Sequence, residues 1–179
     1  MLRATVFFFA VNTITACPGG TTRLDAGLSQ IGFDGGLMHR SNLAHNHVAS
    51  CEDLSCGEDA NPPLGGPHCA TWLPCRVFDA GVNRCNWVHN LEHGHAVLAY
   101  NCPAGCPEIA AALTAIWRGA RESGNTRVLV TPDPKLATKV AAIVWGWGWV
   151  GESVDGDAIA LVLSHQDEEA PESGLSCAP

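Results

Sequence analysis

The feature that most constrains the fold of this chain is its set of cysteines. The sequence contains nine of them. Cys17 stands apart, because it ends an apolar leader, and eight remain along the rest of the chain: Cys51, Cys56, Cys69, Cys75, Cys85, Cys102, Cys106 and Cys177. An even set of cysteines in an exported chain indicates a disulfide framework. We therefore expect up to four bridges clamping the fold.

The pairing of these cysteines is not determined by their spacing. Short separations suggest the following pairs: Cys51–Cys56, Cys69–Cys75, Cys102–Cys106 and, by remainder, Cys85–Cys177. The alternative is that Cys102 and Cys106 coordinate zinc or an iron–sulfur cluster as thiolates. We disfavour it, because an oxidising compartment favours disulfides and the cysteines are scattered rather than grouped into two close-set motifs. Cys69, which follows His68, remains a candidate metal ligand or redox residue.

The first residues of the chain have the pattern of an export signal. One positive charge, Arg3, precedes an apolar run that is too short to span a bilayer. The sequence Ile-Thr-Ala-Cys that ends at Cys17 is similar to the lipobox of bacterial lipoproteins, which implies cleavage before Cys17 and a lipid on its sulfur. The alternative is an ordinary secretory signal with cleavage nearby. We expect residues 1–16 to be a signal peptide and the protein to be lipid-anchored to a membrane of the cell envelope.

Four histidines gather in the centre of the chain. His68 follows a Gly-Gly-Pro turn, and His89, His93 and His95 lie within seven residues of one another. Imidazole is the commonest protein ligand for transition metals. The cluster therefore predicts a site for copper or zinc, between which the ligands do not choose, with His68, His89 and His93 as its core and His95 as a fourth ligand.

The local geometry of this cluster has two readings. An extended segment would place His89, His93 and His95 on one face, whereas a helical turn would place His89 and His93 one turn apart. We favour a strand that begins at His93 and continues through the apolar residues 96–100, with His89 on the preceding turn. Under the alternative without metal, His95 caps the strand or pairs with a carboxylate.

Glu92 lies inside the histidine cluster and has three readings. We rank first a hydrogen bond to a ligating imidazole, which would orient that ring. Glu92 could also be a fourth metal ligand, or a general base if the protein is an enzyme. A second histidine set, His39, His45 and His47, lies in a Gly- and Asn-rich segment, which we interpret as a mobile solvated arm, or less readily as an arm that delivers metal.

The chain is expected to form one compact domain after an irregular beginning. Residues 17–60 are interpreted as a tether and an irregular region that contains Cys and His, residues 61–172 as the compact metal-binding domain, and residues 173–179 as a tail. The net charge of −8 argues against nucleic acid and anionic membrane surfaces as partners.

Hydrophobic periodicity predicts the elements of the compact domain. Residues 107–123 form an amphipathic helix with Pro107 in its first turn, and residues 127–131 form a buried strand. Residues 140–151 are predicted as one strand that carries three tryptophans on one face, which we expect to pack into the core rather than bind a ligand. Residues 157–166 favour a helix over a strand. The fold class is therefore α+β, with a small mixed β-sheet packed by one or two helices and stabilised by disulfides.

The compact domain resembles a bacterial family known only as domain of unknown function 3105. The stretches that carry the likeness are Asn61-Pro-Pro-Leu-Gly-Gly-Pro-His68, Val88-His89-Asn-Leu-Glu-His-Gly94, Val128-Leu-Val-Thr-Pro132, Ala142-Ile-Val-Trp-Gly146 and Ala170-Pro-Glu172. The pattern covers His68, His89, Glu92 and His93, whereas His95 lies outside it. The resemblance implies an exported, often membrane-tethered protein and no particular activity.

Three functions are compatible with these patterns. The first is an envelope-tethered protein that binds copper or zinc through four protein ligands. The second is a metal-dependent hydrolase or oxidoreductase with three histidine ligands, an open position for water and Glu92 as base. The third is a disulfide-stabilised interaction module without metal. We favour the first, because no Ser-His-Asp triad or paired-carboxylate motif accompanies the histidines.

Overall fold

The computed structural model describes residues 32–34, 36–51, 56–57 and 60–179 of the chain. The predicted signal peptide and Cys17 lie outside these residues. None of the helices in the described ranges is long and apolar enough to cross a membrane.

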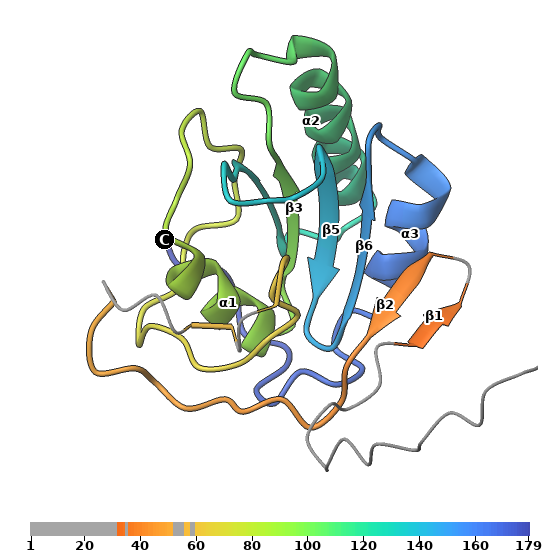
Figure 1. The fold of residues 1–179 in the computed structure, drawn as a ribbon. Helices are drawn as coiled ribbons and strands as arrows, with labels where there is room; N and C mark the ends of the chain where they lie inside the picture. The colour runs from red at the N-terminus through yellow and green to blue at the C-terminus, as the bar shows by residue number, and fades with distance from the viewer. Residues whose placement is uncertain (1–31, 35, 52–55, 58–59) are drawn as a thin grey trace, which may run out of the picture.

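A mixed sheet of six strands forms the centre of the fold, in the spatial order β1-β2-β6-β5-β3-β4 (Figure 1). In chain order the strands are β1 (Gly32–Asp34), β2 (Leu37–His39), β3 (Ala96–Tyr100), β4 (Val128–Pro132), β5 (Val140–Val144) and β6 (Trp147–Gly151). The helices are α1 (Arg84–Glu92), α2 (Pro107–Glu122) and α3 (Gly156–Ser164). Strands β3 and β4 are parallel and are joined through α2, whereas the other pairings are antiparallel.

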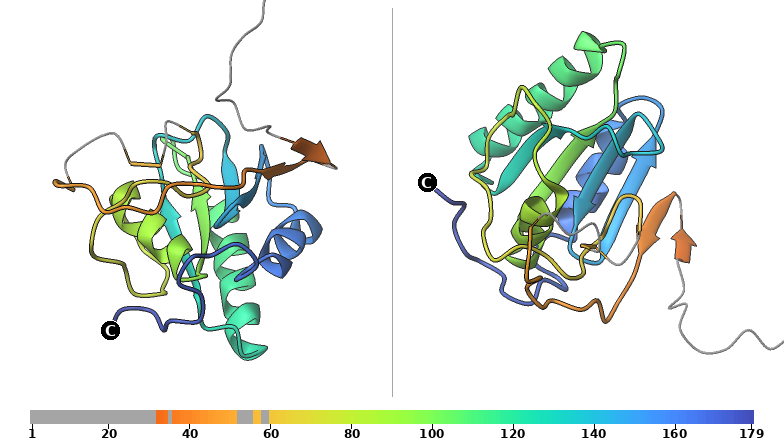
Figure 2. Two further views of the ribbon diagram at one scale, coloured as in Figure 1. Left: turned by 90° about the horizontal axis from the view of Figure 1, so that it is seen from below. Right: turned by 60° about the vertical axis from the view of Figure 1, so that its left-hand side comes forward.

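The two faces of the sheet bury different helices, so the domain has three layers (Figure 2). Side chains alternate between faces along a strand, and β3 follows this rule: Val97 and Ala99 pack with α1, whereas Ala96 and Leu98 pack with α2 and α3. Pro107 at the first turn and a stripe of apolar residues explain why α2 forms where the sequence predicts it. The predicted α+β class is confirmed, with three helices in place of one or two.

The predicted single strand over residues 140–151 is wrong in one respect, because it is a hairpin. Strand β5 ends at Val144, and Trp145 and Gly146 form the connection to β6. Gly146 has a φ of 79°, a conformation that glycine adopts without steric cost. The turn separates the tryptophans: Trp145 belongs to the core beneath α1, whereas Trp147 and Trp149 pack on the opposite side of the sheet.

Four disulfides clamp the described residues, as the cysteine count predicts, but most of the predicted pairs are wrong. The observed bridges are Cys51–Cys69, Cys56–Cys85, Cys75–Cys177 and Cys102–Cys106. Only the last pair agrees with the prediction based on spacing. The others join segments that the fold brings together, and Cys75–Cys177 fastens the end of the chain to the loop before α1. Because Cys69 is disulfide-bonded, it is not a thiolate ligand.

The segment from residue 36 to residue 51 lies against the domain (Figures 1 and 2). Strand β2 pairs with β6, and His47 forms a bridge with His68 through backbone hydrogen bonds on either side. The segment is therefore not a free arm, although His45 and His47 within it are exposed to solvent. The physical reason is that β2 pairs with the free edge of β6, and the Cys51–Cys69 disulfide holds the end of the segment beside His68.

Candidate metal centre

Helix α1 presents His89 and Glu92 on one side, because they are three residues apart. The Asn83 side chain accepts a hydrogen bond from the backbone N–H of Cys85 and caps the start of the helix. The helix ends at His93, and Gly94, with a φ of 74°, turns the chain toward β3. The preferred reading of the sequence was thus wrong for two residues: His89 lies in a helix, and His93 ends that helix instead of beginning a strand.

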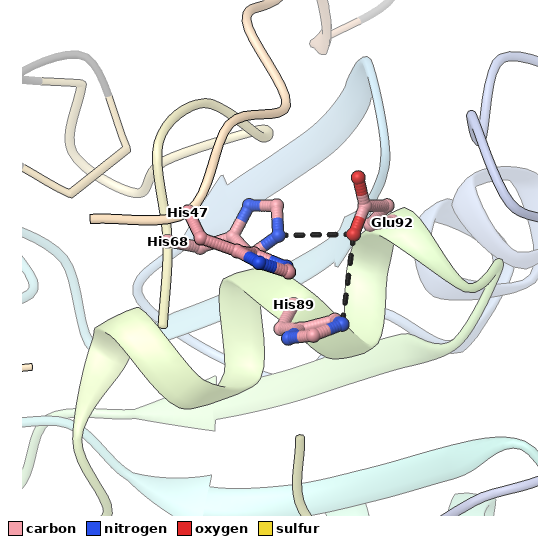
Figure 3. Close-up of side chains that lie close together, drawn as sticks. All are labelled: His47, His68, His89 and Glu92. Carbon is pink, nitrogen blue, oxygen red and sulfur yellow. Dashed lines mark hydrogen bonds and ion pairs between the residues drawn. The ribbon is translucent and has the colours of Figure 1, made fainter. Parts of the chain in front are cut away.

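Three imidazoles and one carboxylate meet beside α1, and we call them the His47 group. Its members are His47, His68, His89 and Glu92, each of which has one donor atom within 4.8 Å of a donor atom of every other. They come from three separate stretches of chain, and one oxygen of Glu92 faces the rings of both His68 and His89 (Figure 3). Apart from His47, all members are buried. This donor set suits borderline transition metals such as zinc and copper.

His68 is hydrogen-bonded through both of its ring nitrogens, one of them to Glu92. His68 Nδ1 lies 2.8 Å from the carbonyl oxygen of Gly66, to which it donates, and Nε2 lies 2.9 Å from Glu92 Oε2. Since an ionised carboxylate can only accept, one proton must lie between Nε2 and Oε2. A metal cation placed between these two atoms would replace that proton and leave both groups as ligands.

His89 is held in the tautomer that a metal requires. Its Nδ1 donates to the carbonyl oxygen of Cys69 at 2.6 Å, so the lone pair of Nε2 faces the group, 3.6 Å from Glu92 Oε2. Burial, followed by the neighbouring His68 and His93, lowers the pKa of His89 to about 4, despite the opposing effect of the Cys69 carbonyl. The imidazole is therefore neutral at pH 7 and needs no proton removed before it can coordinate.

His47 supplies the exposed side of the group. Its ring centroid lies 5.2 Å from that of His68 and 5.1 Å from that of His89. Sequence reasoning assigned His47 to an arm and left it out of the site, because it lies 21 positions before His68 in a stretch without periodicity. The signal that could have found it is the nearby Cys51, whose bridge to Cys69 brings the two histidines together.

His93 lies beside the His47 group but outside it. The ring centroid of His93 lies 4.5 Å from that of His89 and 4.6 Å from that of Trp72, with which it forms a T-shaped pair. His93 is 2% exposed, and neither of its nitrogens has a hydrogen-bond partner among the described residues. Nδ1 lies 3.6 Å from Glu172 Oε2. Burial lowers the pKa of His93, although the carboxylates of Glu92 and Glu172 oppose this effect.

His95 is fully engaged elsewhere, so the structure does not bring it to the group. The side-chain amide of Asn90 donates to Nδ1 at 2.9 Å, and Nε2 donates to the carbonyl oxygen of Leu175 at 2.8 Å. The sulfurs nearest to it belong to the Cys75–Cys177 disulfide and are not thiolates. Burial lowers the pKa of His95 to about 4, which keeps the ring neutral.

A family model described as "Protein of unknown function (DUF3105)" matches residues 47–179. The chain therefore belongs to this family. The match begins at His47, so it includes every member of the His47 group. No curated protein and no solved structure matches the chain.

Proposed function

We propose that this member of the DUF3105 family binds a transition metal ion, copper or zinc, through His47, His68, His89 and Glu92. The observation that carries the proposal is the convergence of four donor atoms within 4.8 Å of one another. Three of the four residues are buried, where a carboxylate is costly unless a positive charge lies beside it, and a bound cation would supply that charge.

The hydrogen bonds behind the ligands support the same proposal. His68 and His89 each donate from Nδ1 to a backbone carbonyl, at Gly66 and Cys69 respectively. Metal-binding histidines use such bonds to fix the tautomer and the orientation of the ring. Both rings therefore direct Nε2 toward Glu92 before any metal arrives, and little reorganisation opposes binding.

The geometry favours a binding role over the alternative of a three-histidine enzyme. In that enzyme Glu92 would act as a base on a metal-bound water. Here Oε2 of Glu92 is hydrogen-bonded to His68 and faces His89, so the carboxylate occupies a ligand position. Four protein donors suit a closed coordination shell, as in structural and metal-carrying sites.

The proposed location is outside the cytoplasm. Four disulfides fit an exported protein. We propose that residues 1–16 are removed as a signal peptide and that a lipid on Cys17 tethers the domain to an envelope membrane. Labelling of cells with a radioactive fatty acid tests the tether: incorporation that Cys17→Ser abolishes supports it, and label retained in Cys17→Ser contradicts it.

The metal site is tested by elemental analysis of protein produced without a histidine tag, loaded with zinc or copper and dialysed against metal-free buffer. We expect His47→Ala and His89→Ala each to weaken binding by at least roughly 100-fold. His165→Ala is the matched control, since His165 lies after α3 and pairs with Glu168 outside the group. Equal metal content in His89→Ala and His165→Ala would contradict the proposal, and no uptake by the wild type would favour an interaction module.

A further inference from the structure

His93 is a buried side chain for which the His47 group provides no role. Both of its nitrogens are buried without a hydrogen-bond partner among the described residues. A buried polar group in that condition costs free energy, and native proteins retain few of them. Two carboxylates lie near it: donor atoms of His93, Glu92 and Glu172 are within 4.8 Å of one another.

Glu92 is common to this trio and to the His47 group. Its Oε2 faces His68 and His89, at 2.9 and 3.6 Å. Its Oε1 points away from them and lies 3.5 Å from Nδ1 of His45. A carboxylate with its two oxygens exposed to different donors can hold one cation on each oxygen, and pairs of metal ions in proteins lie about 3.5–4 Å apart.

We propose that His93, Glu172 and Glu92 form a second cation site, so that Glu92 bridges two metal ions. This inference rests on the proposed function, because the first ion occupies the His47 group. The second site offers two carboxylates and one imidazole, a harder donor set than three imidazoles and one carboxylate, and it therefore suits zinc or manganese(II) better than copper.

The second site is built into the fold and remains accessible from solvent. The backbone N–H of Glu172 donates to the carbonyl oxygen of Glu92 at 3.0 Å, which fixes the chain of Glu172 against the end of α1. The Cys75–Cys177 bridge holds the same terminal segment to the domain. The Glu172 side chain is 60% exposed, so a hydrated cation can reach it before it meets His93.

The test is a count of tightly held zinc ions, after dialysis into metal-free buffer, in the wild type and in three variants. Glu172→Gln removes one charge from an exposed side chain of the second site. Glu152→Gln makes the same change at the far end of β6, where Glu152 is 70% exposed and faces Lys139. His47→Ala weakens the first site alone.

We expect two zinc ions per wild-type chain, two in Glu152→Gln and one in Glu172→Gln. His47→Ala is expected to keep the Glu172-dependent ion. One ion in the wild type that survives in Glu172→Gln and is lost in His47→Ala would overturn the second site and leave the proposed function standing. No zinc in the wild type would overturn both, and two ions in Glu172→Gln would overturn the second site alone.

Discussion

Replacement of His95 by glutamine is predicted to reduce the acid sensitivity of the fold while leaving the metal site intact. His95 is completely buried and donates to the Leu175 carbonyl while accepting from Asn90. Burial lowers its pKa to about 4 in the folded protein, against 6.5 in the unfolded chain. Glutamine keeps an amide that can donate to Leu175 but cannot take up a proton.

The magnitude follows from proton linkage. Between pH 6.5 and 4 the unfolded chain protonates His95 and the folded protein does not, so the unfolded state binds more protons and stability falls as the pH falls. The stability that neutral, buried His95 provides is fully present above pH 6.5 and is lost as the pH falls toward 4. The interval between 6.5 and about 4 corresponds to roughly 3 kcal/mol of unfolding free energy.

The assay is urea denaturation of metal-free wild type and His95→Gln at pH values from 7.5 to 4. His89 and the carboxylates titrate in both proteins, so the difference between the two curves isolates His95. We expect the variant to be less stable than the wild type at pH 7, because it loses the acceptor for Asn90. The difference in unfolding free energy between the two proteins is expected to shrink by roughly 3 kcal/mol toward pH 4. A gap that stays constant over this range would refute the reasoning, and loss of bound metal in the variant would contradict the placement of His95 outside the group.

Three further predictions concern stability. Cys177→Ser removes the disulfide between residues 102 positions apart. Because the unfolded chain then gains entropy, we expect urea denaturation to show a free energy of unfolding lower by about 3–5 kcal/mol, and a decrease below about 1 kcal/mol would contradict this. Gly94→Ala forces a side chain into a left-handed backbone with its Cβ about 2.0 Å from Asp167 Oδ1, so we expect at least roughly 2 kcal/mol of destabilisation, whereas wild-type stability would be unexpected. Leu91→Ala removes a fully buried side chain between α1 and the sheet, and we expect it to lower the free energy of unfolding by about 2–5 kcal/mol. The control is Leu161→Ala on the exposed side of α3, and equal effects of the two substitutions would argue against the packing described for α1.

The elements that the sequence predicts well are those with one buried face. Helix α2 and helix α3 bury apolar stripes against the sheet, and their periodicity is visible in the chain. Helix α1 is buried on nearly all sides, including the polar residues His89 and Glu92, so its sequence lacks an apolar stripe. The helical reading of the histidine motif therefore had no periodic signal to support it.

The site was predictable only in part, because long-range contacts complete it. His68, His89 and Glu92 stand out through their spacing, and the structure brings them together with hydrogen-bond geometry that no spacing encodes. His47 joins them through a backbone bridge and a disulfide. The proximity of His95 in sequence was misleading, because the chain turns at Gly94 and the His95 ring bonds to Asn90 and to the Leu175 carbonyl instead.

The central claim is that histidine and glutamate side chains, without cysteine sulfur, hold the metal. X-ray absorption at the zinc edge of the loaded protein tests it most directly. We predict nearest neighbours of nitrogen and oxygen only, at about 2.0–2.2 Å, with the more distant carbon shells of several imidazoles. Sulfur neighbours at about 2.3 Å, or a shell without imidazole carbons, would contradict it.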